Sequence, residues 1–163
     1  DFRAFERSFQ LMTQVSGRAG RSEKQGKVII QTYNPNHPII QKVIKNDYVS
    51  MYKQELTERQ TFEYPPYFRL IKLTLKHRDF EKLKDGSMWL YQSLKNTLGL
   101  PVLGPEEPPV SRIRNEYIRT ILIKIPTNKN LKAVKSIITK NLNSFDAIAP
   151  YRSIRVGVNV DFY

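Results

Sequence analysis

The chain has 163 residues, 40% of them hydrophobic and 26% charged, so it can form a packed core and is not expected to be disordered. Its 27 Lys and Arg residues exceed its 15 Asp and Glu residues, and the net charge of +12 favours a polyanionic partner such as nucleic acid or an acidic protein segment. The lack of cysteine excludes disulfides and thiolate zinc sites, and no apolar run is long enough for a transmembrane helix, so we expect a cytosolic protein.

The first predicted element is an amphipathic helix near the start of the chain. Apolar side chains recur at spacings of three and four residues from Phe2 to Val15, which is the periodicity of a buried helix face. We expect this helix to end at Gly17, where a loop rich in glycine and arginine begins.

That loop, Gln14–Arg21, has the pattern Gln-x-x-Gly-Arg-x-Gly-Arg. Arginine is permanently charged and presents a planar fork of donors, so Arg18 and Arg21 are candidates for stabilising charge on a transferring phosphoryl group. Gly17 and Gly20 have no Cβ, which lets the backbone approach a ligand closely. The pattern resembles the sixth motif of superfamily 2 helicases, whose arginines reach ATP held by the other lobe. The simpler alternative is a solvated basic turn.

No phosphate-binding loop of the Gly-x-x-x-x-Gly-Lys-[Ser/Thr] type occurs in the sequence. The chain is therefore not expected to hold ATP unaided. An arginine motif without a nucleotide cradle indicates a piece of a longer enzyme.

Three further elements are expected before a proline-rich break. Residues 27–33 are rich in β-branched side chains and predict a buried strand, and helices are predicted over 38–45 and 47–59. Tyr64-Pro65-Pro66-Tyr67 stops helical structure, so we place a domain boundary between residues 1–63 and 64–163. The second of these segments carries most of the excess positive charge.

The second segment predicts a β-α-β-β-α-β order, the split βαβ arrangement of ferredoxin-like α+β folds. The expected elements are a strand at 68–76, a helix at 83–98 stopped by Gly99, a strand at 102–103, a strand at 118–125, a helix over 131–142 capped by Asn128 or Asn130, and a strand at 154–161.

Cations interleaved with aromatic side chains in this segment suit single-stranded nucleic acid, because phosphates take the charges and bases stack on rings. The alternative is that they are ordinary solvated residues. The candidates are Lys72, Lys76, Arg112, Arg114, Arg119, Lys124 and Tyr117. Four lysines on the last helix, Lys129, Lys132, Lys135 and Lys140, form either a solubilising face or a dock for an acidic protein tail.

Motifs along nearly the whole chain resemble the primosomal protein N′ family, the PriA replication-restart helicases. Beside Gln14–Arg21, they are Ile30-Gln31-Thr32-Tyr33-Asn34-Pro35, Asp47-Tyr48, Glu55-Leu56-x-x-Arg59, Tyr64-Pro65-Pro66-Tyr67, Leu103-Gly104-Pro105 and Val158-Asn159-Val160-Asp161. The family usually finishes with Asp-Val-Asp-Pro, whereas this chain has Asn159-Val160-Asp161-Phe162.

The resemblance implies an ATP-dependent 3′-to-5′ DNA helicase of the bacterial cytoplasm and nucleoid, which binds forked and single-stranded DNA. It also implies ATP and Mg in the intact enzyme, zinc held outside this chain, and single-stranded DNA-binding protein and other primosome proteins as partners. Residues 1–63 would end a RecA-like lobe, and residues 64–163 would form a domain similar to ribosomal protein S10.

On the same resemblance, Arg18 and Arg21 would reach the γ-phosphate across the lobe interface, and Gln14, Gly17 and Gly20 would couple the segment to the nucleotide. Two other functions stay open: a non-catalytic RNA- or ribosome-associated module, and a protein-docking platform.

Overall fold

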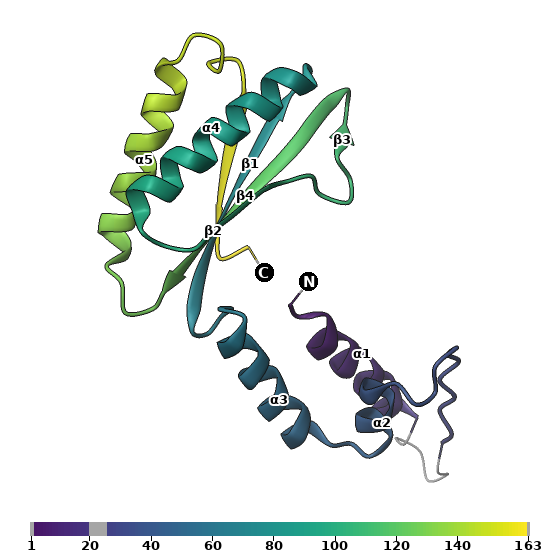
Figure 1. The fold of residues 1–163 in the computed structure, drawn as a ribbon. Helices are drawn as coiled ribbons and strands as arrows, with labels where there is room; N and C mark the ends of the chain where they lie inside the picture. The colour runs from purple at the N-terminus through teal and green to yellow at the C-terminus, as the bar shows by residue number, and fades with distance from the viewer. Residues whose placement is uncertain (1, 20–25, 163) are drawn as a thin grey trace. The chain divides into compact units, whose positions relative to one another are not determined.

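The structure is a computed structural model that describes residues 2–19 and 26–162 (Figure 1). The chain divides into two compact units, Asp1–Phe62 and Glu63–Tyr163. We call the first the helical unit and the second the sheet domain, and describe each by itself.

The helical unit contains α1 (Ala4–Arg18), α2 (Pro38–Ile44) and α3 (Tyr48–Thr61), close to the three predicted helices. Pro38 begins α2 at a position where its missing N–H has no intrahelical partner to lose. The Asp47 side chain accepts a hydrogen bond from the Ser50 N–H and so caps α3. A small core holds the helices together: Phe9, Ile39, Ile40, Val43 and Met51.

Arg59 of α3 contacts one carboxylate on α1 and one on its own helix. Its Nη2 lies 2.7 Å from Glu6 Oε2 and 3.5 Å from Glu55 Oε2. Burial raises the pKa of Glu55, and the neighbouring Arg59 only partly opposes this. Burial also acts to raise the pKa of Glu6, but hydrogen bonds from Arg3 and Arg59 outweigh it and hold that pKa below its usual value. The pair Glu6–Arg59 is therefore an ionised contact between the two helices.

The prediction of a strand over residues 27–33 is wrong. This segment has no regular secondary structure, and the side chains of Ile29 and Tyr33 are fully exposed. A strand needs a neighbour to take its backbone hydrogen bonds, and no described strand pairs with this one. Since the described part of the helical unit contains no strand, its identity as the end of a RecA-like lobe stays a prediction.

The sheet domain confirms the predicted α+β class and the β-α-β-β-α-β order. Its elements are β1 (Phe68–His77), α4 (Phe80–Leu98), β2 (Val102–Glu106), β3 (Arg112–Ile113), β4 (Glu116–Pro126), α5 (Leu131–Ala147) and β5 (Arg155–Val160). The sheet has the order β2-β4-β1-β5, with every neighbouring pair antiparallel. The short strand β3, which was not predicted, pairs with the start of β4 as a hairpin.

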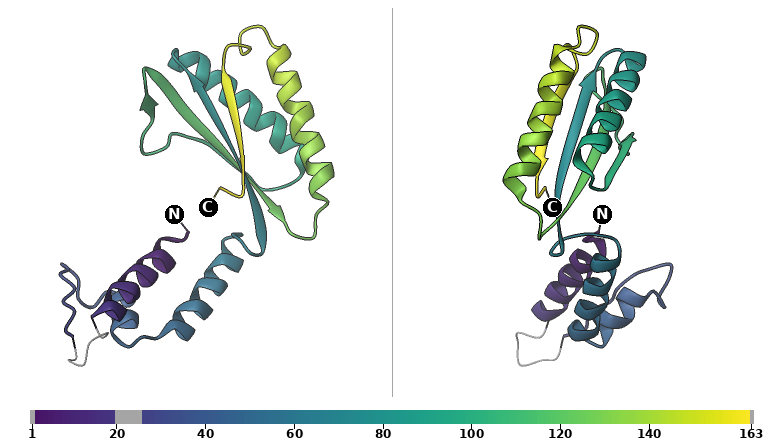
Figure 2. Two further views of the ribbon diagram at one scale, coloured as in Figure 1. Left: turned by 180° about the vertical axis from the view of Figure 1, so that it is seen from behind. Right: turned by 60° about the vertical axis from the view of Figure 1, so that its left-hand side comes forward.

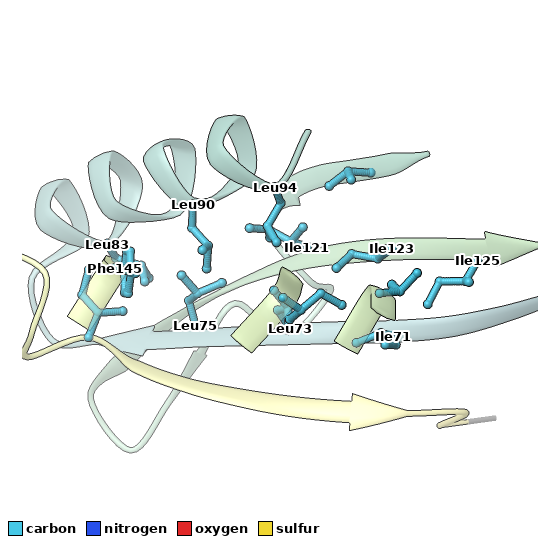
Figure 3. Close-up of a cluster of buried hydrophobic side chains, with 14 residues drawn as sticks. Ile71, Leu73, Leu75, Leu83, Leu90, Leu94, Ile121, Ile123, Ile125 and Phe145 are labelled. Atoms are coloured by element: carbon cyan, nitrogen blue, oxygen red, sulfur yellow. The ribbon is translucent and has the colours of Figure 1, made fainter. Parts of the chain in front are cut away.

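Both helices of the sheet domain cover the same face of the sheet. Figure 1 looks onto α4 in front of the strands, and the reverse view in Figure 2 looks onto the strands themselves. Side chains from β1 and β4 meet those of α4 and α5 in one apolar core (Figure 3), which includes Ile71, Leu73, Leu75, Leu83, Leu90, Leu94, Ile121, Ile123, Ile125 and Phe145. The opposite face carries neither α4 nor α5, although Leu70, Ile118 and Lys124 on that face are buried.

Helix ends in the sheet domain follow their local sequence. Gly99 ends α4 with φ +58°, a left-handed conformation that glycine adopts without steric cost, as predicted. Of the two candidate caps for α5, Asn130 is the residue used, because its side chain accepts hydrogen bonds from the N–H groups of Lys132 and Ala133. Asp79 caps α4 in the same way through the Lys82 N–H.

Truncation of a core leucine tests this packing. Leu90→Ala is expected to lower the free energy of unfolding of the sheet domain by about 3 kcal/mol, because it removes buried contacts and leaves a cavity. Met88→Ala, on the same helix but 42% exposed, is the matched control and should cost less than about 0.5 kcal/mol.

Urea unfolding can be followed by the fluorescence of Trp89, the one tryptophan of the chain, whose ring centroid lies 6.0 Å from that of Phe145 in the core. Equal losses for the two variants would contradict the assigned core.

Candidate nucleic-acid interface and arginine segment

The uncovered face of the sheet carries three cations on adjacent strands. Antiparallel partners share a face, and the register places Lys72 opposite Asn159, Thr74 opposite Gly157 and Lys76 opposite Arg155. Five of these residues, all but Lys72, line a shallow groove together with Val156. We call the set Lys72, Thr74, Lys76, Arg155, Gly157 and Asn159 the open face.

Lys76 and Arg155 face one another directly across the strand pair. Like charges in this position destabilise a sheet, and Glu116 at the start of β4 offsets the cost in part through an ion pair with Arg155. The two positive charges therefore lie close together at a position where their repulsion does not stabilise the sheet. A bound anion such as a phosphate would relieve the repulsion.

Hydrogen bonds between Asp161 and Leu70 hold the last described residues next to Lys72. The Asp161 N–H donates to the Leu70 carbonyl at 2.9 Å, and Asp161 Oδ1 accepts from the Leu70 N–H at 3.3 Å. The next residue, Phe162, places its ring centroid 4.1 Å from the Lys72 Nζ. This phenylalanine, which departs from the usual family ending, thus supplies an aromatic ring at one end of the open face.

Lys124, another predicted nucleic-acid residue, is buried. It lies on β4 opposite Leu70, and its Nζ is 4.2 Å from the ring centroid of Tyr64, which precedes the sheet. Burial lowers the pKa of Lys124, while the charge of Glu63 opposes this shift. The structure therefore places this lysine under the Tyr64 ring and away from the groove.

Arg119 lies on the helix-covered face of the sheet. Side chains two residues apart along a strand share a face, and Ile121 and Ile123 of β4 pack in the core under the helices. The two Nη atoms of Arg119 donate to Ser87 Oγ on α4 and to the Pro105 carbonyl of β2, each at 3.1 Å. This arginine joins α4 to the edge of the sheet.

Arg112, Arg114 and Tyr117 belong to the β3–β4 hairpin. The Arg112 guanidinium carbon is 4.8 Å from the Tyr117 ring centroid, and Tyr117 packs edge-on against Phe80 at the start of α4, with centroids 5.3 Å apart. Arg114 is exposed in the turn. The predicted nucleic-acid residues thus occupy four places, and only Lys72 and Lys76 share the open face.

Sequence reasoning missed Arg155, Asn159 and Thr74 as members of this face. The alternation of the last strand indicated this face, because Arg155, Gly157 and Asn159 lie on one side of the strand and three valines lie on the other. What the sequence lacked was the knowledge that β5 lies next to β1.

The arginine segment begins as helix rather than loop. Gln14, Gly17 and Arg18 are all within α1, so the expected end at Gly17 is wrong. A glycine costs only about 1 kcal/mol in a helix, and the turn before it is complete. Gln14 and Arg18, four residues apart, lie exposed on one side of the helix. Gly20 and Arg21 lie outside the described residues.

The same side of α1 also exposes apolar surface. Leu11 and Val15 are 62% and 58% exposed, and they flank Gln14 and Arg18 in helical spacing. The opposite side of the helix, with Phe5, Phe9 and Met12, packs in the core of the helical unit. Two exposed aliphatic side chains beside Arg18 form a surface suited to contact with another protein segment.

Over residues 2–19 and 26–162, no group of three or more metal-binding side chains comes together. Within those same ranges, the helices lack the combined length and hydropathy that a bilayer crossing demands.

Comparisons with known proteins identify the family. Residues 60–162 match the family model described as the primosomal protein N C-terminal domain. The chain is 36% identical over 165 residues to the replication restart protein PriA of Bacillus subtilis, covering 100% of this chain and 20% of the relative. It is 43% identical over 131 residues to the PriA of Synechocystis, covering 78% and 16%, and 39% identical over 151 residues to that of Treponema pallidum, covering 91% and 22%.

The chain thus spans about a fifth of the length of these relatives. A match across the sheet domain, together with alignments that continue into the helical unit, shows that the chain belongs to the PriA replication-restart family.

Proposed function

We propose that this chain is the C-terminal part of an ATP-dependent 3′-to-5′ DNA helicase that acts in replication restart and primosome assembly. The observation that carries the proposal is the family match, which joins the sheet domain to relatives named replication restart protein PriA. In this proposal the helical unit contributes arginines to an ATP site on another lobe, and the sheet domain binds DNA and partner proteins.

Arg18 and Arg21 act on the nucleotide in this proposal. A guanidinium placed beside the γ-phosphate stabilises the charge that develops as the phosphoryl group transfers. The exposed Gln14 and Arg18 support this role, because both point away from the core of the helical unit. The apolar side chains of Leu11 and Val15 beside them suit a packed contact with the lobe that holds ATP and Mg.

The open face binds the DNA backbone. Lys72, Lys76 and Arg155 neutralise phosphates, and the side chains of Thr74 and Asn159 offer hydrogen-bonding groups between them. Contacts to phosphates do not depend on the base sequence, which fits a protein that must act at any fork. Phe162, beside Lys72, provides a ring on which a base can stack.

A second groove suits a protein partner. It lies between α5 and the edge strand β5 and is lined mainly by apolar side chains, with Lys135 beside them: Ile71, Ile138, Thr139, Leu142, Val158 and Val160. Exposed valines on a strand edge and a lysine beside them fit a short peptide that is both apolar and acidic. We assign this groove to the acidic tail of single-stranded DNA-binding protein, the partner that the family resemblance implies.

Removal of an arginine finger tests the ATPase role. In the full-length helicase, Arg21→Ala is expected to lower ATP turnover by about 10³-fold, because charge on the transferring phosphoryl group loses its stabiliser. DNA affinity should stay within about twofold of wild type. Lys45→Ala, which removes an exposed cation at the end of α2, is the control and should keep normal turnover. Near-normal hydrolysis by Arg21→Ala would refute the assignment.

Salt dependence tests the open face. For the double variant Lys76→Ala/Arg155→Ala, the slope of log affinity for single-stranded DNA against log salt should become shallower by about 1.5, because two phosphate contacts are lost. Lys132→Ala/Lys140→Ala removes the same charge from exposed positions of α5 and should leave the slope unchanged. Fluorescence anisotropy across a salt series measures both. Equal slopes for the two double variants would rule out the open face as the DNA site.

Charge reversal tests the groove between α5 and β5. Lys135→Glu is expected to weaken binding of the acidic tail peptide by about tenfold, because attraction at the groove becomes repulsion. Lys140→Glu, on the same helix but not in the groove, is the matched control. Isothermal titration with the synthetic peptide measures the difference, and an equal effect of both reversals would mean that only net charge matters.

A further inference from the structure

The β3–β4 hairpin has a conformation that its sequence does not favour. Arg114 and Asn115 form the two-residue turn between Ile113 and Glu116, and both have positive φ, +50° and +63°. Hairpins of this kind need left-handed residues at both turn positions, for which asparagine and glycine are suited and arginine is not. An arginine held there suggests that its guanidinium is of use at the tip.

The tip is braced from below. Arg112 lies over the Tyr117 ring and donates a hydrogen bond to the Asn115 side-chain oxygen. Tyr117 in turn packs against Phe80 of α4, and the Ile118 N–H donates to the Ser111 carbonyl at 2.8 Å. The hairpin is therefore an extension of the sheet rather than a loose loop, and it can present side chains in a fixed direction.

Ile113 is exposed at this braced tip. It is 47% exposed, belongs to neither buried core, and stands between two arginines. Its register partner is Glu116, so Ile113 lies on the side of the hairpin that continues the open face, while Arg112 and Tyr117 lie on the helix side.

The basic groove leads to the tip. Glu116, opposite Ile113, pairs with Arg155, and Arg155 faces Lys76 in the groove. In Figure 1, β3 lies beside the first residues of β4, at the margin of the sheet. A DNA strand lying along the open face toward Arg155 therefore meets Ile113 and Arg114 next.

We propose that the hairpin tip recognises the junction at which a DNA duplex ends and a single strand begins. Ile113 packs on the outward face of the last base pair, and Arg114 contacts a phosphate at the junction. The terminal base pair exposes an apolar face with no stacking neighbour, so an aliphatic side chain covers it without separating any bases. The proposal rests on the proposed binding of DNA by the open face and adds the two residues that select the junction of a fork.

The test compares two DNA molecules bound by the full-length protein. One is a forked duplex with a single-stranded arm, and the other is the arm alone as a single strand. The wild type should prefer the fork. Ile113→Ser should reduce this preference by about tenfold while keeping affinity for the single strand within twofold. Val110→Ser, another exposed aliphatic residue in the preceding loop, is the matched control and should keep the preference.

A second variant tests the arginine without disturbing the turn. Asparagine tolerates positive φ, so Arg114→Asn preserves the hairpin and removes only the guanidinium. The salt slope for the fork should become shallower by about 1, and the slope for the single strand should not change. An unchanged urea midpoint for both tip variants would confirm that they are folded.

Three results would overturn the hairpin proposal: a wild type with equal affinity for both DNAs, an Ile113→Ser variant that keeps the full preference, or one that loses affinity for both DNAs equally. A failure of the open face is separable from these. If Lys76→Ala/Arg155→Ala binds both DNAs like the wild type while Ile113→Ser still loses the fork preference, the phosphate role of the open face fails and the junction contact stands.

Discussion

The pairing of β1 with β4 on one side and β5 on the other fixes almost everything that the sheet domain presents. A shift of one residue in either register would turn the core leucines and isoleucines outward and bring the cations against the helices. The same register that buries Leu73 and Leu75 under α4 and α5 therefore places the half-buried Lys72 and Lys76 on the opposite face. Core packing stabilises the register, and the register produces the basic face.

Within that constraint, cations on neighbouring strands have different roles. Arg119 faces the helices and uses its donors on Ser87 and the Pro105 carbonyl, so its charge serves the packing of α4. Lys124 faces the other way but lies under Tyr64, where burial lowers its pKa. Arg155 and Lys76 are side by side and face the groove. Net charge therefore says little about where an anion binds, because the position of each cation on the sheet decides whether it is available.

Most of the sheet domain could be predicted from sequence because its signals are local. Helical spacing, a glycine stop at Gly99 and an asparagine cap at Asn130 act within a few residues of where they occur. Residues 27–33 show the limit of such signals, because a β-prone segment becomes a strand only where another strand accepts its hydrogen bonds. Gly17 shows the same limit for helices, since one glycine does not end a helix that is otherwise complete.

The candidate site was less predictable because it is made of long-range neighbours. Nothing near Lys76 in sequence indicates that Arg155 lies opposite it, and nothing near Lys124 indicates that Tyr64 covers it. Both facts follow from chain topology rather than from side-chain type. The predicted list of basic residues therefore combined side chains from four different environments, and only the strand order could separate them.

Three features of the sheet domain lie near the hairpin and the basic groove and are unfavourable for folding. Lys76 and Arg155 repel one another, Arg114 occupies a left-handed turn position, and Ile113 exposes an aliphatic side chain. They lie along one line, from the groove through the Arg155–Glu116 pair to the hairpin tip. Their alignment is explained by a single extended ligand that supplies phosphates to the cations and an apolar base-pair face to Ile113.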